Sequence, residues 1–124
     1  MFIEIGSSLE NWKIKKYGDV IAEAIYYLVS TDFSSRTIAF GIGGTHYCSN
    51  FSKLIVRENY AFGHVCPKYQ LDNLSWEMVE QALSKSLPKV QEVVIDWKGV
   101  SGHKDKIRVI MENLKNHSIL VRRI

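Results

Sequence analysis

Two histidines follow glycine breaks in this sequence. His46 comes after the glycine-rich run Gly41-Ile42-Gly43-Gly44-Thr45, and His64 comes after Phe62-Gly63. Each break ends a short apolar run of the kind that forms a strand. An imidazole can act as a general base toward water or bind zinc through a neutral nitrogen. Because ligands bind at the carboxyl edge of open α/β sheets, we expect both histidines to lie in loops there and to form one site.

The glycine run before His46 could serve the same chemistry. Gly43, Gly44 and Thr45 can leave successive backbone N–H groups exposed in a sharp turn, and such groups hold a phosphate or a developing oxyanion. The spacing matches neither a Walker loop nor the dinucleotide-binding fingerprint. A tight turn between a strand and a helix, without ligand binding, stays an open alternative.

A cysteine follows each histidine two residues later, giving His46-x-Cys48 and His64-x-Cys66. Residues i and i+2 point the same way in extended backbone, so these four side chains could ligate one zinc ion. Structural zinc sites more often use Cys-x2-Cys spacing. Reduced thiols that pack at or near the core are therefore the interpretation that the sequence favours.

Three charged residues follow other predicted strands or turns. Lys68 comes after Pro67, and Asp96 and Lys98 come at the end of an apolar run. Asp96 could orient a histidine or hold a water, and a hydrogen bond to its own turn is an equal alternative. The two lysines could contact a phosphate.

Apolar runs and helical periodicity alternate along the chain. Strands are predicted at 2–5, 37–40, 60–62, 90–97 and 118–121. Helices are predicted after Ser7-Ser8, with a break at Gly18, then from Asn50 or Ser52 to Val56, from Ser75 to Pro88, and around Ile107 to Leu114. This order predicts an α/β protein, a three-layer α/β/α sandwich around a mostly parallel or mixed sheet of about five strands.

Composition fits one ordinary globular domain over residues 1–124. Apolar residues make up 46% and charged residues 23% of the chain, which argues against disorder. No apolar run approaches the ~20 residues of a membrane helix, so we expect a cytoplasmic protein without a membrane anchor. The surplus of positive charge lies in the second half of the chain, which permits an RNA or phosphate partner.

Four blocks of sequence together resemble the C-terminal part of the archaeal and plant type of D-aminoacyl-tRNA deacylase. They are Phe2-Ile3-Glu4-Ile5-Gly6-Ser7-Ser8, Gly41-Ile42-Gly43-Gly44-Thr45-His46-Tyr47, Phe62-Gly63-His64 with Pro67-Lys68-Tyr69, and Asp96-Trp97-Lys98-Gly99. They occur in the family's order and span almost the whole chain. Two positions depart from the family pattern: Thr45 replaces a third glycine, and Cys48-Ser49 replaces Ala-Pro.

The resemblance implies a hydrolase of translation quality control that cleaves the ester between a D-amino acid and the tRNA 3′ end, with zinc as cofactor. It makes His46 the leading catalytic or metal-binding residue and His64 the second, with Lys68 and Lys98 contacting the tRNA end. Family members also have an N-terminal half that this chain lacks. The alternatives are a non-catalytic module that binds the tRNA acceptor end, a separately encoded half completed by another chain or a homodimer, and an enzyme acting on another small ester or amide.

Overall fold

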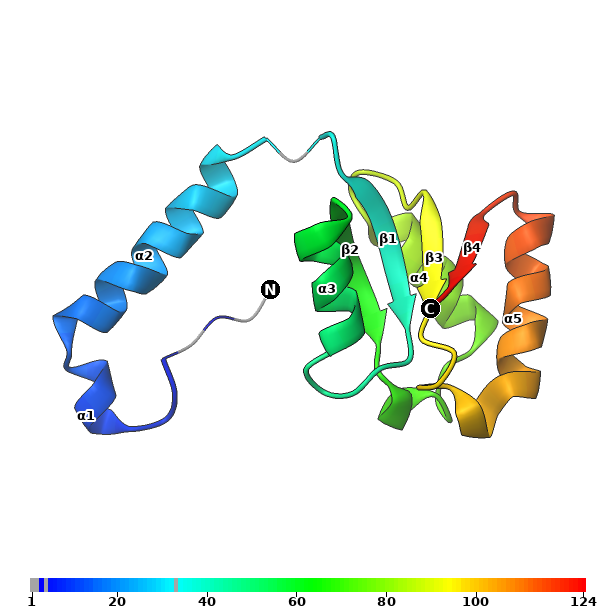
Figure 1. Ribbon diagram of the computed structural model, residues 1–124, viewed down its shortest axis with the longest axis horizontal. Coiled ribbons are helices and arrows are strands. Elements are labelled where there is room, and N and C mark those ends of the chain that lie inside the picture. The colour runs from blue at the N-terminus through cyan, green and yellow to red at the C-terminus, as the bar shows by residue number, and fades with distance from the viewer. Residues whose placement is uncertain (1–2, 4, 33) are drawn as a thin grey trace. The chain divides into compact units, whose positions relative to one another are not determined.

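The computed structural model describes residues 3, 5–32 and 34–124, in the chain order of Figure 1. The chain divides into two compact units, Met1–Ser34 and Ser35–Ile124. Each unit is described by itself. The expectation of a single domain over residues 1–124 stays a prediction.

The first unit is helical. Helix α1 spans Leu9–Trp12 and helix α2 spans Lys15–Ser30. The predicted break at Gly18 is wrong, because Gly18 lies inside α2. The chain instead breaks at Ile14, whose extended backbone (φ −81°, ψ 103°) precedes α2. The indole N–H of Trp12 donates to the Gly6 carbonyl at 2.6 Å, which ties α1 to the segment before it.

The predicted strand over residues 2–5 falls partly outside the described residues. Phe2 and Glu4 are not described, and neither Ile3 nor Ile5 belongs to a strand.

The second unit contains a parallel sheet of four strands in the order β2-β1-β3-β4. Its strands are β1 (Thr37–Ile42), β2 (Tyr60–Cys66), β3 (Glu92–Ile95) and β4 (Leu120–Arg123). The α/β class and the parallel sheet are confirmed. The expected fifth strand is the one at residues 2–5.

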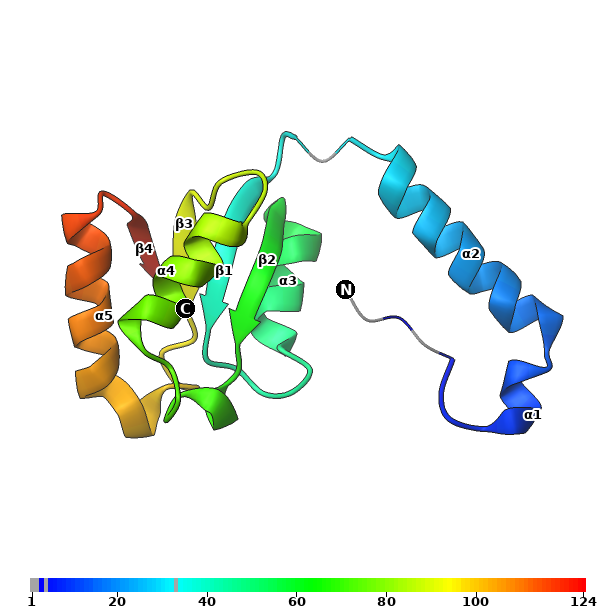
Figure 2. The same ribbon diagram turned by 180° about the vertical axis from the view of Figure 1, so that it is seen from behind.

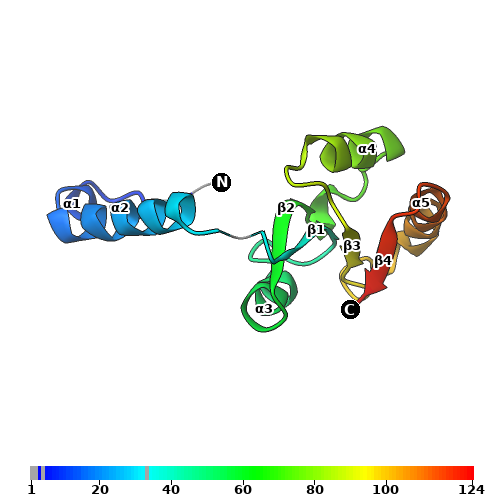
Figure 3. The ribbon, with the colours of Figure 1, turned by 90° about the horizontal axis from the view of Figure 1, so that it is seen from above.

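Helices cover both faces of this sheet, as Figure 2 and Figure 3 show. Helix α3 (Ser49–Arg57) packs on one face, and helices α4 (Trp76–Lys85) and α5 (Lys104–Asn116) lie on the other. Under α3, the buried residues are Ala39, Phe51, Leu54, Tyr60 and Val94. Under α4 and α5, they include Phe40, Ile42, Val79, Val93, Ile95, Ile107 and Leu114. The three-layer sandwich is therefore confirmed.

Strand β2 runs further than the sequence predicts. It continues through Gly63, and its register against β1 shifts there: Ala39 pairs with Phe62, and Phe40 pairs with His64. Glycine tolerates the irregular backbone of such a bulge. The extra residue reverses the alternation of side chains, so Phe62 packs toward α3 whereas His64 lies on the α4 face. The prediction that His64 follows the strand in a loop is wrong.

Helix boundaries follow local backbone chemistry. The predicted N-cap of α4 is confirmed, because the Ser75 hydroxyl accepts a hydrogen bond from the Met78 N–H at 3.3 Å. Helix α3 begins at Ser49, earlier than predicted, because Cys48 adopts the left-handed conformation (φ 48°) that turns the chain into the helix. None of the described helices is long and apolar enough to cross a membrane.

Candidate functional site

The glycine loop after β1 is fixed to the segment after β2. Gly43 and Gly44 adopt φ values of +97° and +82°, a region that favours glycine. The Gly43 N–H donates to the Cys66 carbonyl at 2.8 Å, and the Lys68 N–H donates to the Gly44 carbonyl at 3.0 Å. These two bonds hold the loop at the carboxyl edge of the sheet.

The loop after β3 closes tightly against the glycine loop. A Cβ atom on Gly99 would lie 2.5 Å from the Gly44 nitrogen, closer than non-bonded atoms approach. A Cβ on Gly43 would lie 3.0 Å from the Asp96 carbonyl oxygen. Glycine at these positions allows the two backbones to touch.

Asp96 joins three segments at this edge. Its side chain is buried, with 5% of the residue exposed. One carboxylate oxygen accepts from the Gly99 N–H and the other from the Asn50 side-chain amide, both at 3.0 Å. Because neither histidine is among its hydrogen-bond partners in the described chain, Asp96 acts here by positioning the loop after β3 and the start of α3.

Backbone donors remain free in the glycine loop. Of the three residues predicted to bind an oxyanion or phosphate, Gly43 uses its N–H in the bond to Cys66. Within the described part of the chain, no hydrogen bond uses the N–H of Gly44 or Thr45. Unpartnered backbone N–H groups are uncommon at buried positions such as Gly44. They are the donors that an oxyanion would require.

His46 is exposed in this loop, as predicted. Its ring lies 5.1 Å from the ring of Tyr47 and 6.5 Å from that of Tyr69, measured between centroids. The next side chain in the loop, Cys48, has its sulfur 3.1 Å from the Thr45 carbonyl oxygen. Burial, and then the negative charge of Asp96, raise the pKa of the Cys48 thiol. Cys48 is therefore a poor nucleophile at neutral pH.

His64 has different neighbours. Its Nδ1 lies 3.1 Å from the hydroxyl of Ser86, a residue with only 4% of its surface exposed. That hydroxyl donates its own hydrogen to the Ala82 carbonyl at 2.8 Å. We therefore assign the proton of the neutral ring to Nδ1, which leaves Nε2 as the basic nitrogen. Gly63 allows this approach, since a Cβ there would lie 3.1 Å from the Ser86 oxygen.

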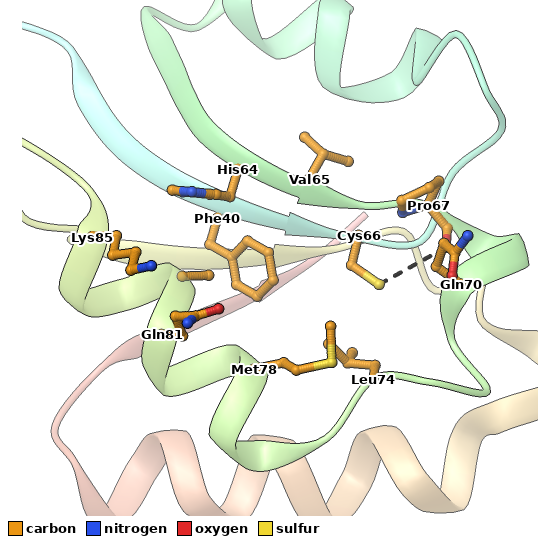
Figure 4. A pocket seen from close by; sticks show the side chains of 11 residues that line it. Phe40, His64, Val65, Cys66, Pro67, Gln70, Leu74, Met78, Gln81 and Lys85 are labelled. Atoms are coloured by element: carbon orange, nitrogen blue, oxygen red, sulfur yellow. Dashed lines mark hydrogen bonds between the residues drawn. The ribbon is translucent and has the colours of Figure 1, made fainter.

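A pocket of about 330 Å³ lies between β2 and α4 beside His64 (Figure 4). Its wall is largely apolar, with amide and amine groups around it. The lining residues are Phe40, His64, Val65, Cys66, Pro67, Gln70, Leu74, Met78, Gln81, Ala82 and Lys85. His46 is not among them, so the structure gives the two histidines separate surroundings.

The two predicted substrate-binding lysines also lie apart. Lys68 is exposed in the short 3-10 helix η1 (Lys68–Gln70), whose first N–H anchors the glycine loop. Lys98 is exposed and lines a groove of about 420 Å³ between α3 and the end of the sheet. Lys53 and Arg57 of α3 line the same groove.

The described residues do not assemble a zinc site. Among them, no group of three or more His, Cys, Asp or Glu side chains is placed to hold a metal ion. Both cysteines are free thiols, and Cys66 lies on the α4 face of the sheet with its pKa raised by burial. His46 and His64 alone would leave tetrahedral zinc without enough protein ligands.

A family model for D-aminoacyl-tRNA deacylase matches residues 1–119. The chain belongs to this family. It is 37% identical over 115 residues to the D-aminoacyl-tRNA deacylase of Thermococcus kodakarensis, covering 91% of this chain and 42% of that protein. It is also 37% identical over 123 residues to the deacylase of Methanocaldococcus jannaschii, covering 96% and 46%.

A solved structure supports the fold of the family member. The crystal structure of a conserved protein of unknown function matches with a TM-score of 0.81 and 26% identity, covering 95% of this chain and 40% of that one. The chain thus spans less than half the length of the relatives that it matches.

Sequence reasoning missed several residues that build this edge. Asn50 was considered only as a helix cap, yet it holds Asp96. Ser86 orients His64 from a segment 22 residues away, and no local pattern indicates that contact. Lys53 and Arg57 carried a usable signal, because two cations four residues apart on a helix face the same way.

Proposed function

We propose that this family member takes part in hydrolysis of the ester bond of D-aminoacyl-tRNA, releasing the D-amino acid and free tRNA. The proposal rests on family membership together with one observation of the site. That observation is the pair of unpartnered N–H groups at Gly44 and Thr45, directly followed by His46 in a loop fixed at the sheet edge. A carbonyl oxygen held by those donors would stand within one loop of a general base.

The chemistry follows from these groups. His46 accepts a proton from a water molecule as the water oxygen attacks the ester carbonyl carbon. The carbonyl oxygen becomes an oxyanion that accepts hydrogen bonds from the Gly44 and Thr45 N–H groups. When the tetrahedral intermediate collapses, the bond to the ribose oxygen breaks, and the imidazolium returns the proton to that oxygen. Asp96 keeps the loop in place.

His64 and the pocket beside it have a supporting role in this scheme. Nε2 of His64 is a basic nitrogen next to an apolar cavity that adjoins the glycine loop through Cys66 and Pro67. An amino-acid side chain or a nucleobase fits the size and character of such a cavity. Lys68 and Lys98 would contact phosphates of the tRNA end.

Zinc and the cytoplasmic location remain expectations that come from the resemblance and the composition. Because the described residues provide too few ligands, no step above uses a metal ion. Elemental analysis of the purified chain tests the zinc expectation directly.

A non-catalytic module that binds the tRNA acceptor end is the second candidate. It is favoured by the length of the chain, which spans 42% and 46% of the two deacylases named above. Such a module, or one half of a divided enzyme, would bind tRNA without releasing amino acid. The same experiment separates the two candidates.

The test is release of D-amino acid from D-aminoacyl-tRNA by the wild type and by His46→Ala, His64→Ala and His117→Ala. Loss of a general base typically lowers the rate 10²- to 10⁴-fold, and we expect His46→Ala to do so. His117→Ala is the control, because His117 is an exposed residue after α5 whose Nδ1 bonds the Asn113 carbonyl. Tight tRNA binding without hydrolysis by the wild type would reject the enzyme in favour of the module.

A further inference from the structure

Three exposed rings stand together beside the glycine loop. Tyr47 is 85% exposed and Tyr69 is 56% exposed. The ring of His46 lies next to both, at centroid distances of 5.1 Å and 6.5 Å. Neither tyrosine is among the described residues that form the two core clusters. We call these three rings the aromatic edge, and their open faces are available to a planar partner.

Two cations lie next to the aromatic edge. Lys53 and Arg57 are one turn apart on α3, about 6 Å along the helix axis, and so face the same side. With Tyr47 they line a hollow of about 370 Å³, and they also border the groove that contains Lys98. In the described chain, none of these three cations forms an ion pair. Their charges are available to an anionic partner.

We propose that the aromatic edge, Lys53 and Arg57 form a binding surface for single-stranded RNA. Bases stack on Tyr47 and Tyr69, and phosphates contact the two cations. A duplex hides the faces of its bases, whereas an unpaired strand presents them, so exposed rings beside cations fit the unpaired strand. The inference rests on the proposed function, because that strand is then the 3′ end of the tRNA. Its terminal nucleotide would lie beside His46.

Stacking is tested with a fluorescent, unpaired RNA oligonucleotide that ends in CCA and carries no amino acid. Its affinity for the 124-residue chain is measured by anisotropy. We expect Tyr47→Ala and Tyr69→Ala each to weaken binding roughly tenfold. Tyr47→Phe keeps the ring and is the matched control, with affinity close to that of the wild type.

Phosphate contact is tested by the dependence of affinity on salt. Each phosphate contact on a single strand contributes a slope of about 0.7 in log affinity against log salt, so the Lys53→Gln/Arg57→Gln double variant should lose about 1.4. Lys115→Gln removes an exposed cation from α5, on the opposite face of the sheet, and should leave the slope unchanged.

The inference and the proposed function fail in different ways. Absence of RNA binding by the wild type, or Tyr47→Ala and the double variant binding like their controls, overturns the inference. Release of D-amino acid would still stand in that case. RNA binding that depends on these residues, without any hydrolysis, supports the inference and rejects the enzyme.

Discussion

At the scale of single residues, Asp96 shows how one carboxylate can organise a site without touching the reacting atoms. Its two oxygens hold the Gly99 N–H and the Asn50 amide, and its charge raises the pKa of Cys48. The position of Asp96 at the end of a strand could be predicted from the sequence. Its partners could not, because Asn50 is 46 residues away and no periodicity connects the two.

The charge of Asp96 gives a prediction for the reactivity of Cys48. Burial is the larger cause of its raised pKa and Asp96 the smaller, so Asp96→Asn should lower the pKa and increase the thiolate fraction at pH 8. We expect alkylation of Cys48 by iodoacetamide to become roughly two- to fivefold faster. Mass spectrometry of the labelled peptides measures the rate.

Cys66 is the internal control for this experiment. Its pKa is raised by burial and lowered by Lys106, and Asp96 is not among the causes. Its alkylation rate should therefore stay the same in both proteins. An equal acceleration of both thiols would mean that Asp96→Asn loosens the fold and would contradict the electrostatic explanation.

At the scale of elements, the contrast between β1 and β2 separates what the sequence can predict from what it cannot. The strand and glycine loop around Gly43 follow from apolar content and glycine spacing, and the structure agrees. The bulge at Gly63 depends on pairing with β1, which is a tertiary contact, so the place of His64 was predicted wrongly. The layers, the N-cap at Ser75 and the apolar stripe of α5 were accessible to local rules.

The contact between the loops after β1 and β3 predicts a loss of stability in Gly99→Ala. The added Cβ would meet the Gly44 nitrogen at 2.5 Å, and backbone cannot move aside as a flexible side chain can. We expect the free energy of unfolding to fall by about 1–3 kcal/mol, measured by urea denaturation. Gly102→Ala is the control, because nothing lies within 4 Å of the added atom there. Equal stability of the two variants would contradict the close packing of the loops.

At the scale of the whole molecule, the described core lies in one unit. Every residue that counts as buried, from Ala39 to Leu114, belongs to Ser35–Ile124, whereas α1 and α2 contain none. The alternation of strands and helices predicted the second unit well. It could not define how residues 1–34 relate to it, because an amphipathic helix such as α2 has the same pattern whichever partner it packs against.

The location of the core predicts that residues 35–124 fold without the first unit. The fragment retains the four strands, α3, α4, α5 and both core clusters, so burial of apolar surface, the main stabilising term, is preserved. We expect cooperative urea unfolding, followed by circular dichroism, with a free energy within about 1 kcal/mol of that of the full chain. An unfolded or strongly destabilised fragment would instead support a single domain over residues 1–124, with α2 contributing to its core.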